Sequence, residues 1–395
     1  MSSPPQKDFL DRVVPHIRAG GARNIVELAK ALRMPVETTR YKVKGMLKQG
    51  LEIHASFDYG KFGLRHYYAY LKLSDKGRAV EKKLFTLLGE QGCLSSCARR
   101  LPSNDYACKF TIPISADRRG GAGGGSSLKR MLRGLSEEKL LEGIPEVHSV
   151  SWERAHMIQP EFFDLKHGAW EIDWGRIKKE PQAVSASPSS SSASRSRGDE
   201  ESKKAEEADA GGEAAGEFDE LDLLICRQLE SDALTRLSEI ATALKTTLNN
   251  VFYHFHKHIT ESRLLEEYVI RWTGSPQHRQ NTMYMQLRFS DLTLSEERNA
   301  RGVVRKLPFL WSDALSDDTG FYVAEAMAPQ EAYLDTLNFL SSSLGEGASS
   351  KLRVLVLDAR NRQQFPLPVE LYRNQRWAFD PDQLVEQAPS RLKRG

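Results

Sequence analysis

The feature that most constrains this chain of 395 residues is an internal repeat, in which two segments about 212 residues apart follow the same order of expected elements. Residues 24–50 read as two short amphipathic helices and precede the strand-like segment 67–73, YYAYLKL. Residues 236–262 read in the same way and precede 283–289, MYMQLRF. The shared order predicts that the chain is a duplication of one structural unit.

After these segments, each half continues with the periodicities of a helix, two strands, a second helix and a last strand. These segments are 81–90, 93–101, 106–114, 127–135 and 147–153 in the first half, and 301–307, 310–317, 321–329, 330–344 and 351–359 in the second. With the preceding strand they give the order β-α-β-β-α-β, the ferredoxin-like plan. The predicted fold class is α+β, with two winged helix-turn-helix domains each followed by a ferredoxin-like βαββαβ domain.

A polar segment between the halves sets the domain boundaries. Residues 178–217 contain almost no large apolar side chain, so they cannot bury enough surface to offset the entropy of ordering, and we expect a disordered linker rich in Ser and Glu. The expected domains are a winged helix-turn-helix at 1–65, a ferredoxin-like domain at 66–177, a second winged helix-turn-helix at 218–275 and a second ferredoxin-like domain with a C-terminal tail at 276–395.

The first pair of short helices has the pattern of a DNA-reading helix-turn-helix. Asn24 can cap one helix, and Pro35 suits the first turn of the next. Such a second helix enters the major groove, where its polar and basic side chains meet base edges and phosphates. Residues 51–68 read as two strands around a turn, a wing that would carry cations to the phosphate backbone. The predicted DNA-contacting residues are Thr38, Thr39, Tyr41, Lys42 and Lys48 on the helix, and Lys61 and Arg65 on the wing.

The second half keeps the apolar positions and changes the exposed chemistry. Asn250, Tyr253, His254 and Lys257 are expected to face outward and to contact DNA, on a surface less basic than the first. His254 and His258 share a helical face, but no carboxylate or cysteine with matching spacing completes a metal site, so we predict no metal.

Composition limits the class of protein. No apolar run approaches the roughly 20 residues that span a bilayer, and the N-terminal segment lacks the pattern of a secretory signal, so we expect a cytoplasmic protein that does not enter a membrane. The four cysteines are too sparse for a disulfide framework and are expected to be reduced and buried. The net charge of +3 neither demands nor excludes nucleic acid.

On these patterns the chain resembles the Lrp/AsnC family of archaeal and bacterial transcriptional regulators. Residues 218–244 resemble the family's opening helices, and residues 319–322, TGFY, resemble a strand start of its sandwich domain. Thr38-Thr39, Lys42-Val43, Met46 and Gly50 stand where the family has its Thr-Val, Arg-Ile, Leu and Gly. The chain departs from the pattern in its GGAGGG insertion at 120–125 and in lacking an Asp after Tyr322.

The resemblance implies a DNA-binding transcriptional regulator whose partners are double-stranded DNA and often a small effector such as an amino acid. It also implies dimers formed through the sandwich domains, which a duplicated chain can replace by pairing its own halves into a pseudo-dimer. A flexible tether of about 40 residues would permit that pairing. No cofactor, no catalytic residue and no enzymatic activity are expected.

Two alternatives remain open. The sirohaem decarboxylases share this two-domain plan, and His278, Arg279, Asn281 and Met283 resemble the basic and polar residues near that family's substrate. The other alternative is an interaction scaffold whose winged domains bind protein. Trp170 and Trp377, which lie in the repeated tail segments 162–174 and 368–380, are expected to pack in a core or interface.

Overall fold

The computed structural model of the chain describes residues 7–18, 20, 23–103, 105–114, 125–179, 218–273, 281–316 and 320–393. The predicted linker therefore falls almost entirely on residues 180–217, which lie outside the described ranges. His278 and Arg279 lie outside them as well.

Two groups of short helices appear in corresponding places of the two halves. The first consists of α1 (Lys7–Arg18), α2 (Ile25–Leu32) and α3 (Val36–Lys48), and the second of α10 (Glu220–Ser231), α11 (Leu237–Ala243), α12 (Leu248–Tyr253) and the π-helix η3 (His254–Glu261). Asn24 caps α2 as predicted, since its side chain accepts hydrogen bonds from the backbone N–H groups of Val26 and Glu27. The predicted core positions Leu28, Leu32 and Met46 are each at most 1% exposed.

The strand after each helix group pairs with its counterpart from the other half. β1 (Leu51–Phe57) runs antiparallel to β9 (Leu265–Trp272), with Leu51 opposite Trp272. The prediction that residues 51–68 form a hairpin wing is wrong, because β2 (Leu64–Lys72) has both edges occupied by strands of its own sheet. A strand has two hydrogen-bonding edges, so β1 takes a partner from the other half instead.

The four-stranded arrangements of the two halves have the same strand order. The first half contains β2, α4 (Asp75–Ala79), α5 (Glu81–Gln91), β3 (Leu94–Leu101), β4 (Asp105–Pro113), α7 (Ser126–Glu137), β5 (Val147–Val150) and β6 (Trp152–Ala155). The second contains β10 (Thr282–Phe289), α13 (Leu294–Val304), β11 (Leu310–Leu315), β12 (Tyr322–Pro329), η5 (Gln330–Ala332), α14 (Tyr333–Ser343), α15 (Gly345–Lys351) and β13 (Leu352–Leu357). The strands are ordered β5-β2-β4-β3 and β13-β10-β12-β11.

These strands belong to one antiparallel sheet of ten strands that runs through both halves. β13 pairs with β3, and β6 of the first half pairs with β11 of the second. β14 (Gln363–Gln364) is added to β3. β5 and β6 stand at the two ends of the main strand order, but only Ser151 separates them along the chain. The chain therefore passes directly from one end of the order to the other. The predicted α+β class is confirmed at this level.

The tail of each half packs on the other half. The first tail comprises η2 (Pro160–Phe162), β7 (Phe163–Asp164), β8 (Ala169–Trp170) and α8 (Trp174–Lys179), and the second comprises η6 (Ala359–Asn361), η7 (Val369–Leu371), β15 (Tyr372–Arg373), β16 (Arg376–Trp377) and α16 (Pro381–Lys393). Phe162 and Ile177 are buried in the core formed by α13, α14 and their strands, whereas Leu384 and Leu392 are buried against α5 and α7. The two tails therefore exchange places.

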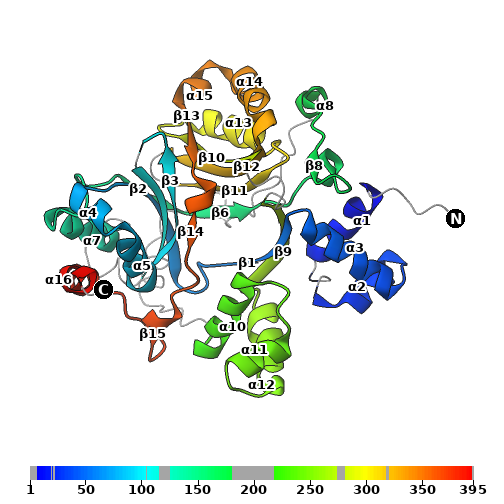
Figure 1. Cartoon of the computed structure of the whole chain (residues 1–395), viewed down its shortest axis with the longest axis horizontal. Helices are drawn as coiled ribbons and strands as arrows, with labels where there is room; N and C mark the ends of the chain where they lie inside the picture. Colours follow the sequence, from blue (N-terminus) through cyan, green and yellow to red (C-terminus); the bar gives the residue numbers. More distant parts are fainter. Residues whose placement is uncertain are drawn as a thin grey trace, which may run out of the picture.

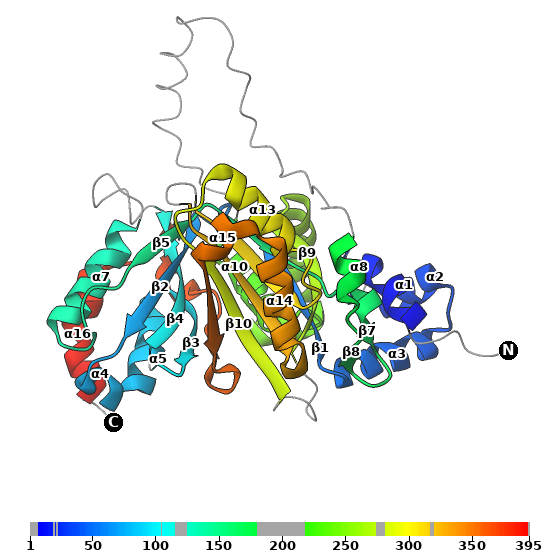
Figure 2. The ribbon, with the colours of Figure 1, turned by 90° about the horizontal axis from the view of Figure 1, so that it is seen from above.

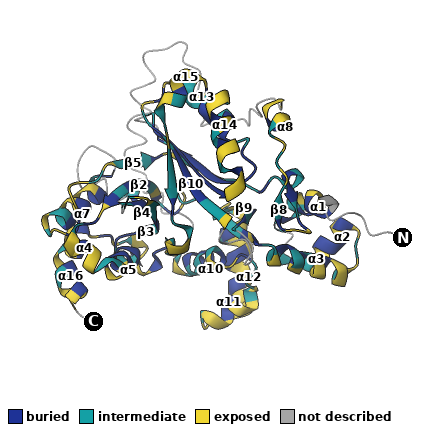
Figure 3. Cartoon of the chain, turned by 45° about the horizontal axis from the view of Figure 1, so that its top comes forward, coloured by how far each residue is buried: buried dark blue, intermediate teal, exposed yellow. Residues whose placement is uncertain are grey.

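Figure 1 shows the resulting layout, with α4, α5, α7 and α16 at the left, α13 to α15 at the top, and the two groups of short helices at the right and below. Figure 2 shows α1 to α3 at the opposite end of the molecule from α7 and α16. In Figure 3 the strands are mostly buried, while the outer faces of the helices are exposed. Side chains alternate along β2: Tyr67 and Leu71 pack against helices, and Tyr70 reaches Gln286 of the other half.

Candidate functional site

The predicted DNA-contacting residues of the first half are only partly presented to solvent. Thr38, Tyr41 and Lys48 are exposed on α3. Lys42 is half-buried, with its Nζ 5.2 Å from the centre of the Phe9 ring. Thr39 is fully buried, and its hydroxyl donates a hydrogen bond of 3.0 Å to the Pro35 carbonyl, so its predicted place on a reading surface is wrong.

The two predicted wing cations do not lie on a hairpin. The Lys61 ammonium donates hydrogen bonds to the carbonyls of Ser262 and Arg263 at 2.9 and 3.1 Å, where it satisfies acceptors of the other half just beyond η3. Arg65 is exposed on β2 and lines a cavity between the halves. The structure thus separates these two residues from α3.

In the second half, Asn250, Tyr253 and Lys257 are exposed, as predicted. Lys257 forms an ion pair with Glu261 at 2.6 Å. His254 was predicted to face outward, but it is 8% exposed and its Nδ1 lies 2.8 Å from a carboxylate oxygen of Asp222 on α10. That contact holds the imidazole against the helix pair instead of presenting it to a groove.

A cavity of about 730 Å³ lies between the two halves. Its lining comes from β1 to β6 of the first half, from α10, β9, β11 and β12 of the second, and from the segment after η6. Its ionisable lining residues are Glu52, His54, Asp58, Tyr59, Arg65, His66, Lys109, Glu153, Glu230, Glu266, Arg271, Glu325 and Arg362. A cavity of this size accepts a ligand as large as most cofactors.

Two guanidinium groups are the most distinctive part of this lining. Arg271 and Arg362 both approach the Trp311 ring, at 6.0 and 5.0 Å from its centre. Burial, together with the neighbouring charge of Arg362, lowers the pKa of Arg271. Within the described ranges no carboxylate lies within ion-pair distance of either group, and the Nε of Arg271 has no hydrogen-bond partner. Both residues are half-buried, and because cations that are withdrawn from water are ordinarily paired, this pair is suited to an anionic ligand.

A second cluster within the cavity contains Lys109, Glu153 and His66. The Lys109 ammonium forms an ion pair with Glu153 at 2.6 Å, and His66 Nε2 lies 3.7 Å from the same carboxylate. Burial and the positive charge of Lys109 lower the pKa of His66 to about 3, so its imidazole is neutral near pH 7. Burial alone would raise the pKa of Glu153, but the Lys109 ammonium holds that pKa below its ordinary value.

Glu230 also lines the cavity, and its pKa is shifted in the opposite direction to that of Glu153. It stands near the end of α10, where it accepts a hydrogen bond from Tyr59 and another, at 2.9 Å, from the Leu367 backbone N–H. Burial is the largest influence on Glu230 and raises the pKa of its carboxyl group. A carboxyl group whose pKa is raised by burial is the kind of group that acts as a general acid.

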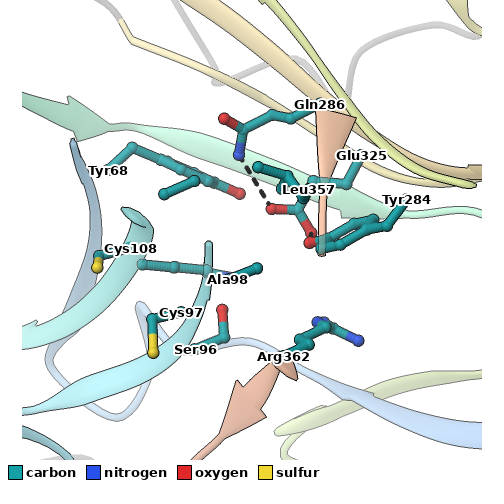
Figure 4. Close-up of a pocket in the computed structure, with 12 residues that line it drawn as sticks. Tyr68, Ser96, Cys97, Ala98, Cys108, Tyr284, Gln286, Glu325, Leu357 and Arg362 are labelled. Carbon is teal, nitrogen blue, oxygen red and sulfur yellow. Dashed lines mark hydrogen bonds between the residues drawn. The ribbon is translucent and has the colours of Figure 1, made fainter. Parts of the chain in front are cut away.

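A small polar pocket of about 10 Å³ adjoins the cavity and shares Ser96, Lys109, Glu325 and Arg362 with its lining. Figure 4 shows Tyr284, Gln286 and Glu325 in this small pocket, together with Arg362 and Ser96. Tyr284 donates a hydrogen bond to Glu325 at 2.8 Å, and the Gln286 amide donates one at 3.3 Å. These hydrogen bonds satisfy the buried carboxylate, which lines both hollows.

No local sequence pattern indicated this site. Glu153, Arg271 and Arg362 stand in three separate segments and match no motif spacing. The one usable signal was charge inside apolar strands, since Lys109 and Arg271 interrupt segments that otherwise read as buried. Asn281 and Met283, the described members of the predicted substrate-side group, do not line this cavity. Trp170 packs edge-on against Trp272 at 5.7 Å and Trp377 donates a hydrogen bond to the Phe62 carbonyl, which confirms packing roles for both.

Comparisons with known proteins identify neither a sequence family nor a curated relative. The solved structure of the siroheme decarboxylase NirDL matches with a TM-score of 0.49 and 8% identity, over 97% of this chain and 98% of that chain. NirDL in complex with an iron-uroporphyrin III analogue matches with a TM-score of 0.49 and 10% identity, over 98% of each chain. A structure of PH0061 matches with a TM-score of 0.30 and 14% identity, over 38% of this chain and 98% of that chain.

These comparisons correct one prediction. Against the expectation of no enzymatic activity, two of the solved structures that align with nearly all of this chain are of an enzyme. What this chain does chemically has to be argued from its own cavity. In the part of the chain that the structure describes, no helix is both long and apolar enough to cross a membrane.

Proposed function

We propose that the chain is an enzyme that binds a large, planar polycarboxylate in the cavity between its halves and removes carboxyl groups from it as CO2. The tetrapyrrole class fits this description, and it includes the iron-uroporphyrin III analogue with which NirDL was solved. The observation that carries the proposal is the pair of half-buried guanidinium groups, Arg271 and Arg362, that have no carboxylate partner among the described residues.

Each lining group has a place in this reaction. Arg271 and Arg362 hold carboxylates that are retained, because charge-assisted bidentate bonds fix position and orientation. When the reacting carboxyl group leaves, its C–C bond breaks, CO2 departs, and the bonding electrons stay on carbon until a proton joins them. Glu230 is the proton donor that we assign, because its pKa is raised and it lines the cavity. The neutral imidazole of His66 adds a hydrogen-bonding group without adding charge.

Ligand binding and turnover test the proposal separately. Iron-uroporphyrin III is titrated into the wild-type chain, into Arg271→Met with Arg362→Met, and into the exposed control Arg353→Met, and binding is followed by absorbance. We expect each lost guanidinium of the pair to weaken binding roughly 10- to 100-fold, as for hydrogen bonds to charged groups. The mass of the ligand after incubation reports the loss of CO2. A double variant that binds as tightly as the wild-type chain would contradict the proposed ligand site.

Glu230→Gln examines the proposed proton donor. We expect this variant to bind the tetrapyrrole as the wild-type chain does but to release CO2 at least about 100-fold more slowly, the usual contribution of a general acid. Normal turnover in this variant would remove Glu230 from the mechanism and leave the binding site standing.

DNA binding through α3 is our second candidate function, favoured by the exposed Thr38, Tyr41 and Lys48 on one helix. The matching strand orders of the two halves support the finer architecture of a duplicated winged helix-turn-helix and ferredoxin-like unit, paired as a pseudo-dimer within one chain. Replacing Lys42 and Lys48 together should flatten the salt dependence of DNA affinity by about one logarithmic unit of slope per lost phosphate contact. An unchanged slope would count against this surface. An amino-acid effector and association between chains stay predictions.

A further inference from the structure

A cluster of three potential metal ligands lies in the second helix group and takes no part in the proposed reaction. Asp222 is on α10, and His254 and His258 are on η3. The two carboxylate oxygens of Asp222 face different imidazoles, with Oδ1 2.8 Å from His254 Nδ1 and Oδ2 3.0 Å from His258 Nδ1. Their ligand atoms all lie within 4.8 Å of one another.

The burial of Asp222 makes this cluster unusual. Its side chain is 0% exposed, and a buried carboxylate requires charge compensation. Among the described residues its ion-pair partners are the two histidines, and no Lys or Arg is in reach. The His258 side chain is 27% exposed, so one side of the cluster opens to solvent. A cation can therefore enter from that side.

The spacing of the donor atoms suits a common ion. Two ligand atoms that are each about 2.1 Å from a metal lie about 3.0 Å apart when the ligand–metal–ligand angle is a right angle. They lie about 3.4 Å apart when that angle is tetrahedral. The two oxygen-to-nitrogen distances of 2.8 and 3.0 Å match the right-angle value. Two imidazoles and one carboxylate on one face of an ion form a well-known ligand set for divalent first-row transition metals.

Local structure brings the two histidines to the same carboxylate. The helix changes from α to π at His254. In a π-helix a turn is longer than four residues, so side chains four apart stay close to one face, and such turns are frequent at functional sites. The Tyr253 ring flanks both imidazoles, at 5.7 and 5.3 Å between ring centres.

We propose that Asp222, His254 and His258 bind one divalent first-row transition ion, which clamps α10 to η3. Asp219 Oδ1, 3.7 Å from His254 Nδ1, is close enough to assist, and water completes the coordination from the open side. The proposal departs from the prediction of no metal site, because the structure adds a carboxylate that stands 32 residues before His254. The inference is independent of the cavity and of its proposed reaction.

Zn2+ is the probe for the test. The metal-free full chain is titrated in competition with a chromophoric chelator, alongside Asp222→Asn, His258→Gln and two controls, His256→Gln and His167→Gln, which replace exposed histidines. We expect one equivalent to bind the wild-type chain and both controls. His258→Gln should weaken binding by at least the roughly 10- to 100-fold that even an outer-shell partner contributes.

Two further measurements keep the test decisive. Circular dichroism shows whether each variant is folded, and His258→Gln, at a partly exposed position, is the informative variant if Asp222→Asn unfolds. X-ray absorption of the Zn2+ complex should show nitrogen and oxygen ligands at about 2.0–2.2 Å and no sulfur at about 2.3 Å. Absence of stoichiometric binding to the wild-type chain, binding unaffected by His258→Gln, or sulfur ligation by the buried cysteines would each overturn the proposal.

Discussion

At the scale of single residues, the interior contains charged groups that the fold must hold in place. Asp313 is 1% exposed and lies 2.6 Å from His156 Nε2, 2.9 Å from Arg305 Nε and 3.0 Å from the Tyr322 hydroxyl. Burial alone would raise the pKa of Asp313, but His156 and Arg305 hold it below its ordinary value. The carboxylate therefore joins β11 to β6 and α13 as an ion.

Replacing this residue by Asp313→Ala should lower the free energy of unfolding by about 3–5 kcal/mol, because it leaves Arg305 without this carboxylate. Urea unfolding at pH 7 measures the loss, and Asp335→Ala, at an exposed position of α14, is the matched control. If Asp313→Ala lowers the free energy of unfolding no more than the control does, the ion pairs at Asp313 contribute nothing to stability.

His66 makes a pH dependence predictable. Its pKa in the folded protein is lowered from 6.5 to about 3, first by burial and then by Lys109. The unfolded chain therefore binds a proton between these values and the folded chain does not, so the free energy of unfolding falls as the pH drops below about 6.5. His66→Gln should reduce this dependence between pH 6.5 and 4, measured by urea unfolding. Equal slopes in wild-type and His66→Gln protein would contradict the argument.

At the scale of elements, the exchanged tails depend on close approach between helices. A Cβ added at Gly134 on α7 would meet Val385 of α16 at 2.8 Å, so the two helices touch where only glycine fits. Leu384 of α16 is 3% exposed in the core of the first half. The C-terminal helix thus completes a core that is encoded mostly some 250 residues earlier.

Leu384→Ala should lower the free energy of unfolding by about 2–5 kcal/mol, as for other buried leucines. The loss comes from both the removed apolar contacts and the cavity left between α5, α7 and α16. Urea unfolding measures it, and Glu386→Ala on the exposed side of the same helix is the control. If both variants lower the free energy of unfolding by the same small amount, α16 is not part of that core.

The sequence predicted the individual strands better than it predicted which strands pair with one another. Strands β2 to β4 and β10 to β13 coincide closely with the expected segments, because periodicity is a local property. The pairing of β1 with β9 was missed, since a strand does not reveal which edge elsewhere in the chain is free. The cavity was missed for the same reason: Lys109 and Arg271 stand on strands that are distant in the sequence, and only the folded chain brings both to one lining. The cluster at Asp222 was half visible, in the spacing of His254 and His258.

At the scale of the whole molecule, four strand pairings and two exchanged tails cross between the halves, so neither half has a complete core or covered edges of its own. β1–β9, β3–β13, β3–β14 and β6–β11 all join first-half to second-half strands. Fragments 1–179 and 218–395, produced together, should therefore assemble into a one-to-one complex with a single unfolding transition, whereas each alone should aggregate through exposed strand edges.

Size-exclusion chromatography with light scattering and calorimetry measures both results. Ile270→Asp should dissociate the fragments, because Ile270 is 0% exposed and pairs with Ile53, and a charge buried there has no partner. Glu331→Gln, at an exposed position of η5, should leave the complex intact. Fragments that fold separately, or two independent unfolding transitions in the intact chain, would mean that each half is a domain in its own right. In that case the cavity would have to open whenever the halves part, and tetrapyrrole affinity would fall on dilution of the fragments.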